Sequence, residues 1–217
     1  MGQKKHKNGF DLTVHPQALE EPYKRKKPTR ILCCSMGDLF HKDVPLDYIQ
    51  QVFKVICENP QHLFMIVTKR IEILNQYHSQ LTWPNNLLQA VSVEHPRYNY
   101  RLKLLQETNA KHKVAFFEPL LEDLGDLDLS GIVWAFMGGE SGKNSRPCKA
   151  EWVENLRDQC ETQQVSFTFK QWGGRYRKRN GSLLHGQYYH DMPLSNQVRI
   201  YNMENCPTFP VWSGNWA

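Results

Sequence analysis

The sequence predicts an α/β fold in which mostly parallel strands alternate with helices. Short apolar runs of strand length alternate along the chain with segments whose apolar residues recur at helical spacing. Most of the short runs are continuously apolar, which is typical of parallel strands buried on both faces. Each run also stops at a polar or charged cluster, and in parallel sheets and barrels the carboxyl ends of the strands carry the functional site.

The expected elements follow an irregular lead-in over residues 1–29, which contains several X-Pro pairs. Strands are expected at residues 31–34, 62–67, 88–91, 113–117, 132–137 and 166–169. Helices are expected at residues 46–58, 71–81, 98–108 and 150–163. In each helix the apolar residues gather on one face, which can then cover the sheet. Right-handed crossovers through these helices would bring all strand ends to the same side.

Two boundaries follow from residues that interrupt regular structure. Asn59-Pro60 ends the helix at 46–58, and Pro84 lies beyond the end of the weaker helix at 71–81. After Gly173-Gly174 the chain becomes polar and rich in glycine and asparagine. We therefore expect an α/β unit over residues 30–174 and a mostly irregular extension over residues 175–217 that packs on it.

Bulk properties exclude several classes of protein. A chain of 217 residues can bury one sizeable core, and no apolar run approaches the roughly 20 residues that span a bilayer. We expect no membrane partner. The charged N-terminus is not followed by the apolar region of a secretory signal, so a cytoplasmic location is expected. The 6 cysteines form no CxxC pair, and no metal site is predicted.

The net charge of +5 is concentrated in two stretches. The candidates for nucleic-acid contact in these stretches are Lys24, Arg25, Lys26, Lys27, Arg175, Arg177, Lys178 and Arg179. Such groups can bind phosphates, and they are equally compatible with an ordinary solvated surface. The sequence therefore leaves nucleic acid open as a partner.

Polar residues at the strand ends are the candidates for lining one pocket. They are Ser35, Asp38, Thr68, Lys69, Arg70, Ser92, Glu94, Glu118, Gly138, Gly139, Glu140, Lys170 and Trp172. The three glutamates could bind a cation or ribose hydroxyls or act as acid and base, or they could pair with neighbouring lysine and arginine. The glycines could bring main-chain N–H groups to a phosphate or form a tight turn. No nucleophile arrangement stands out, so no catalytic residue is assigned.

Several strand-end phrases, taken together and in order, resemble one known family. They include Gly9-Phe-Asp-Leu-Thr-Val-His-Pro, Ser35-Met-Gly-Asp-Leu-Phe-His, Thr68-Lys-Arg, Val91-Ser-Val-Glu, Glu118-Pro-Leu-Leu, Gly138-Gly-Glu-Ser-Gly and Phe169-Lys-Gln-Trp-Gly. The chain is similar to a phage-associated family of unknown function whose fold resembles that of radical SAM enzymes. The resemblance implies a partial (β/α) barrel of the radical-SAM or TIM-like type, with its pocket at the strand ends. It also implies a location in the cytoplasm of a bacterial host.

The chain departs from this family at the cysteine motif. Family members carry a cysteine loop that ends in CxxC after a first strand, and this sequence contains no CxxC. We therefore expect the chain to start beyond that loop and to lack the first barrel strand. Cys33 and Cys34 are adjacent in a strand and cannot replace three thiolates in a loop. Gly37 replaces a serine and Ile71 a proline of the family pattern.

These differences leave three functional hypotheses open. With a second polypeptide that supplies the cysteines, the chain would use S-adenosylmethionine and a [4Fe-4S] cluster, whereas alone it would hold neither. Without a cluster, it would bind a small ligand, a nucleotide or nucleic acid. As a phage accessory protein, it would bind a host protein. In every case a second polypeptide, self-association or the basic lead-in is expected to cover the exposed edge of the strand at 31–34. Whether the chain is an enzyme stays open.

Overall fold

The computed structural model describes residues 12–34 and 37–193 and contains one six-stranded parallel sheet with the strands in sequence order. Ser35, one of the predicted site residues, lies outside the described residues. The strands are β1 (Arg30–Cys33), β2 (Leu63–Thr68), β3 (Leu87–Ser92), β4 (His112–Phe117), β5 (Ile132–Gly138) and β6 (Ser166–Gln171). All neighbouring pairs are parallel, so the predicted α/β half-barrel is confirmed.

The described residues form six α-helices. They are α1 (Glu21–Lys24), α2 (Leu46–Glu58), α3 (Ile71–Tyr77), α4 (Tyr100–Glu107), α5 (Ala150–Thr162) and α6 (Arg177–Asn180). The four longer helices, α2 to α5, lie where helices were expected, whereas α1 and α6 were not predicted. The helix expected at 71–81 is shorter, because a 3-10 turn over His78–Gln80 follows α3. The lead-in is less irregular than expected, since a 3-10 turn at Pro16–Glu20 runs into α1. No helix of the described chain is long and apolar enough to cross a membrane.

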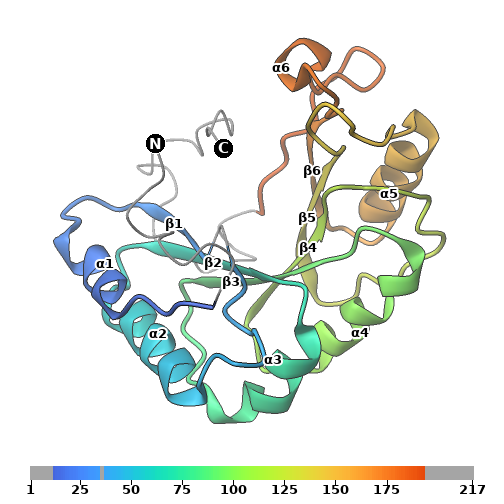
Figure 1. Ribbon diagram of the computed structural model, residues 1–217. Helices are drawn as coiled ribbons and strands as arrows, with labels where there is room; N and C mark the ends of the chain where they lie inside the picture. Colours follow the sequence, from blue (N-terminus) through green and yellow to red (C-terminus); the bar gives the residue numbers. More distant parts are fainter. Residues whose placement is uncertain (1–11, 35–36, 194–217) are drawn as a thin grey trace.

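The sheet is curled, and the two faces differ in what covers them (Figure 1). The α2 to α5 helices lie along the convex side, where Phe64, Phe117 and Phe169 of the strands are buried in the main core together with helix residues such as Ile49 and Leu102. The opposite face carries a smaller cluster made of strand residues. We call it the concave cluster; its buried members are Leu63, Met65, Leu88, Ala90, Val114, Trp134 and Phe136.

The outer edge of β6 is covered by the chain itself. Phe169 donates its N–H to the carbonyl of Tyr189 at 2.8 Å, and Asp191 donates its N–H to the carbonyl of Phe167 at 3.0 Å. These bonds flank an antiparallel bridge between Thr168 and His190. The described part of the C-terminal extension therefore packs against the last strand and satisfies its main-chain groups.

One buried side chain fastens the loop between α2 and β2. The Asn86 amide nitrogen lies 3.1, 3.0 and 2.9 Å from the carbonyl oxygens of Ile56, Asn59 and His62. We expect Asn86→Ala to lower the free energy of unfolding by about 2 kcal/mol, because buried carbonyls would lose their donor. Urea denaturation measures this loss. In the matched control Asn85→Ala, which removes an exposed bond to Lys111, the change should stay below about 0.5 kcal/mol, and equal losses in both variants would contradict the assignment.

Candidate functional site

Three of the predicted charged residues share the concave side of the sheet. Side chains alternate between the two faces along a strand. Lys69 and Glu118 each lie two residues beyond a member of the concave side, Val67 and Phe116 respectively. Lys170 lies in β6, at the edge of the sheet, and its ammonium group reaches Glu118. The ion pair therefore spans β5, which lies between β4 and β6.

The pair of Glu118 and Lys170 is the centre of this region. The Lys170 Nζ lies 2.9 Å from Oε1 and 3.1 Å from Oε2 of Glu118. Both side chains are mostly but not fully buried, with exposed fractions of 18% for Glu118 and 19% for Lys170. A Cβ added at Gly138 would lie 3.1 Å from the Glu118 carboxyl carbon, so this glycine makes room for the carboxylate.

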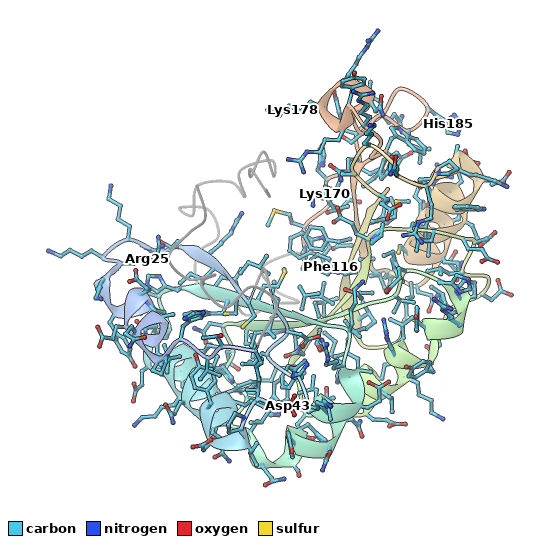
Figure 2. All side chains as sticks on the ribbon, in the orientation of Figure 1. Arg25, Asp43, Phe116, Lys170, Lys178 and His185 are labelled. Carbon is cyan, nitrogen blue, oxygen red and sulfur yellow. The ribbon has the colours of Figure 1, made fainter. Side chains whose placement is uncertain are left out.

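Aromatic rings lie on the same face, toward the middle of the sheet. The Phe116 and Phe136 rings are stacked with centroids 4.8 Å apart, and the Trp134 ring follows at 4.1 Å from that of Phe136. Phe136 and Trp134 are buried, whereas Phe116 is partly exposed. Figure 2 shows Phe116 and Lys170 on the inner side of the curled sheet. A ligand that entered the concave face would meet an aromatic ring close to the ion pair.

Asp38 ties two loops together rather than pointing into free space. Its Oδ1 accepts hydrogen bonds from the Thr68 hydroxyl at 2.7 Å and from the N–H of Phe40 at 3.0 Å. Its Oδ2 accepts from the N–H of Lys69 at 3.0 Å and from the Arg70 guanidinium at 3.1 Å. The carboxylate is thereby used to hold the loop after β1 against the end of β2.

Glu94 is occupied by two cations. Its Oε1 accepts from Lys69 Nζ at 2.9 Å, and its Oε2 accepts from the buried guanidinium of Arg101 at 3.1 Å. Arg101 also donates to the Ser92 carbonyl at 2.8 Å and lies over the Tyr98 ring at 4.0 Å. The sequence analysis did not select Arg101, although a cation beside the apolar Leu102 and Leu105 face was a clue that this helix carries a buried pair.

Glu140 points to a different partner from Glu118. Its carboxylate accepts two hydrogen bonds from the Arg146 guanidinium, at 2.9 and 2.6 Å, and one from the Arg146 N–H at 2.8 Å. The hydrogen bonds from Arg146 hold the pKa of Glu140 at about 2. The structure thus brings Glu118 and Lys170 together, while Glu94 and Glu140 are used in separate ion pairs.

The glycines and the tryptophan at the strand ends serve the packing of the main chain. Gly139 donates its N–H to the Gln171 carbonyl at 2.8 Å, so this group is already used. A Cβ at Gly139 would lie 2.1 Å from the carbonyl oxygen of Trp172. The Trp172 indole donates to the Leu183 carbonyl at 2.9 Å and packs edge-on against Phe169. The glycine-rich sequence at the end of β5 is explained by this close approach, because a side chain at Gly139 would collide with the main chain after β6.

Comparison with known proteins adds a family to this geometry. A family model described as "Protein of unknown function (DUF5131)" matches residues 1–193. The chain belongs to the DUF5131 family. Neither the curated proteins nor the solved structures give a match. The functional argument for this DUF5131 protein therefore rests on its own residues.

The described cysteines of this DUF5131 chain are not grouped as the ligands of a cluster. In the described residues no group of three or more His, Cys, Asp or Glu side chains is placed to hold a metal ion. Cys33 packs against the convex core, and burial raises the pKa of its thiol to about 12, which disfavours the thiolate that binds iron. Cys160 is buried in α5 with a pKa likewise raised to about 12 by burial. These residues do not fit a [4Fe-4S] cluster.

The two basic stretches of the DUF5131 chain lie at opposite ends of the sheet. Residues 24–27 precede β1, and residues 175–179 follow β6. Figure 2 shows Arg25 and Lys178 far apart on either side of the opening of the curl. The two basic stretches are therefore separate surfaces.

A hollow of about 450 Å³ between α4 and residues 126–128 contains none of the predicted site residues.

Proposed function

We propose that the chain binds a nucleoside-type small molecule on the concave face. The observation that carries this proposal is the partly exposed Phe116 ring, stacked on Phe136, two residues before the Glu118–Lys170 pair. A flat base would lie against Phe116, since aromatic rings favour stacked arrangements. The sugar or amino acid part would reach the strand ends, where sites of parallel sheets are found.

The Glu118 carboxylate has acceptor capacity left for such a ligand. An ionised carboxylate can accept about four hydrogen bonds, two at each oxygen. Lys170 donates to both oxygens, and Gln171 makes a long contact of 3.4 Å to Oε1. Among the described residues Oε2 accepts a hydrogen bond from Lys170, and a ribose hydroxyl or a ligand amino group could donate a further one. Lys170 holds the carboxylate in its orientation while the ligand binds.

S-Adenosylmethionine is the first ligand to test, because the sequence resembles a phage-associated family with a radical-SAM-like fold. The parallel half-barrel supports this relationship. Since the described cysteines do not fit a cluster, the proposal is ligand binding, and radical chemistry would need cysteines from a second polypeptide. The β1 strand at the edge of the sheet is where such a polypeptide would pair. The setting we propose is the cytoplasm of a bacterial host.

Calorimetric titration with S-adenosylmethionine, adenosine and 2′,3′-dideoxyadenosine tests the proposal. We expect Phe116→Ala to weaken binding of all three compounds by about tenfold or more, because base stacking contributes roughly 1–3 kcal/mol. We expect Glu118→Gln to weaken adenosine binding by about tenfold and to leave dideoxyadenosine binding almost unchanged. This pattern would assign the ring to Phe116 and the ribose hydroxyls to Glu118.

Two matched variants control for general damage to the fold. Tyr100→Ala removes an aromatic side chain that is 47% exposed on α4, and Glu122→Gln neutralises an exposed glutamate that pairs with His95. Both should bind the nucleosides like the wild type. If the wild type binds none of the three compounds at about 1 mM, or if Phe116→Ala binds them normally, the proposal is wrong.

A further inference from the structure

A second surface lies beyond the carboxyl ends of β5 and β6 and is separate from the concave face. It is formed by residues 141–150 and 172–190, two segments that contain no aspartate or glutamate. We call it the basic surface; its cationic residues are Lys143, Arg146, Lys149, Arg175, Arg177, Lys178 and Arg179. A run of this size without an acid attracts polyanions through its summed field.

Main-chain hydrogen bonds join the two segments of the basic surface. Gly174 donates its N–H to the Glu140 carbonyl at 2.7 Å and accepts from the N–H of Gly142 at 3.2 Å. These bonds frame a parallel bridge between Ser141 and Gly174. Lys143 and Arg175 therefore follow directly from neighbouring main-chain runs, which lie about 4.8 Å apart in paired strands. The cations are held on a fixed backbone rather than on a loose tail.

Several cations of the basic surface are available to a ligand. Arg175, Lys178 and Arg179 are exposed and form no ion pair with the described carboxylates. Glu140, which directly precedes the first segment, is already bound by Arg146. Figure 2 shows Lys178 at the outer tip of the molecule, directed toward solvent. Phosphate groups could reach these side chains without displacing an internal partner.

Exposed aromatic rings lie near these cations in the sequence. The Tyr176 side chain is 60% exposed and is covered on one side by the Arg175 guanidinium at 5.3 Å. The Tyr188 side chain is 64% exposed and is stacked on the His190 ring, with centroids 5.5 Å apart and planes 18° from parallel. Cations combined with open ring faces are the features that bind unpaired bases and their backbone. A duplex, whose bases are stacked internally, would gain nothing from the rings.

We propose that the basic surface binds single-stranded nucleic acid. Arg175, Lys178 and Arg179 contact the phosphates, and Tyr176 and Tyr188 stack with bases. The assignment is independent of nucleoside binding on the concave face, because it uses none of the same side chains. The expected ligand is a nucleic acid and not an acidic protein, because an acidic peptide would contact the cations and would not stack on the tyrosine rings.

Fluorescence anisotropy with labelled 15-nucleotide oligo(dT) and oligo(U) tests the proposal. We expect the triple variant Arg175→Ala, Lys178→Ala, Arg179→Ala to bind about 30-fold more weakly at roughly 0.1 M salt. Its plot of log affinity against log salt should be shallower by about two units, because each phosphate contact on a single strand contributes roughly 0.7. We expect Tyr176→Ala with Tyr188→Ala to bind about tenfold more weakly with the salt slope unchanged.

A charge-matched control distinguishes binding at the basic surface from a general effect of the protein's net charge. The variant Arg25→Ala, Lys26→Ala, Lys27→Ala removes the same number of exposed cations at the other end of the sheet, and its affinity should stay within about threefold of the wild type. Equal losses in the two triple variants, or no oligonucleotide binding by the wild type, would overturn the proposal. So would tighter binding of polyglutamate, or tyrosine variants that bind normally. Nucleoside calorimetry on the same variants, expected to be unchanged, keeps the two proposals distinguishable.

Discussion

Gly139→Ala is expected to lower the midpoint of thermal unfolding by about 6–12 °C. A Cβ at this position would lie 2.1 Å from the carbonyl oxygen and 2.7 Å from the carbonyl carbon of Trp172. Both atoms belong to the main chain, so no side chain can rotate away to relieve the contact. The ends of β5 and β6 would have to separate, at a cost of about 3 kcal/mol or more. For a chain of this size each kcal/mol shifts the midpoint by about 2–4 °C.

Circular dichroism during heating measures this shift, and Gly37→Ala is its matched control. A Cβ at Gly37 would meet no heavy atom within 4 Å. The same chemical change should therefore move the midpoint by less than about 2 °C. If Gly139→Ala unfolds at the same temperature as the wild type, the close approach of Gly139 and Trp172 is incorrect.

Glu94→Leu is expected to destabilise the protein by about 3–5 kcal/mol, the second of the two largest effects. Without the carboxylate, the Arg101 guanidinium would stay buried with the Ser92 carbonyl and the Tyr98 ring as its contacts. An uncompensated buried charge is costly because it has lost its hydration. Urea denaturation of Glu94→Leu measures the loss directly.

The double variant Glu94→Leu with Arg101→Met decides whether charge pairing is the cause. Replacing a buried pair by apolar residues is often close to neutral, so the double variant should regain most of the lost stability. Lys69→Met is the control for the exposed partner, whose side chain is 50% exposed, and it should cost less than about 1 kcal/mol. A double variant as unstable as Glu94→Leu would show that the packing of Glu94, and not its charge, matters.

The fold could be predicted from the sequence because the apolar pattern within each strand and each longer helix indicates that element. The helix expected at 46–58 has the same bounds in α2, since its apolar face and the following Asn59-Pro60 act within the segment. The helix expected at 71–81 was too long, because the switch to a 3-10 turn after Tyr77 depends on tertiary contacts such as the hydrogen bond from the Asn109 N–H to the His78 ring. Periodicity does not contain that information.

The candidate site could be predicted only as a region. The alternation of strands and helices places polar residues at one end of the sheet, but it does not say which charges pair. Arg101 in α4 pairs with Glu94, and Arg146 in the loop after β5 pairs with Glu140. A glycine-rich strand end likewise fits a phosphate loop or a close main-chain contact, and the register of β5 with β6 decides for the contact. Side-chain geometry of this kind is not encoded in spacing.

The covered edge of β6 limits how copies of this chain can aggregate. An open-ended fibre built by sheet extension needs two unpaired sheet edges on each subunit. One edge pairs with the preceding subunit and the other with the next. Here the stretch around His190 already fills the second edge. Polymerisation by direct pairing of β1 in one copy with β6 in the next is thereby blocked.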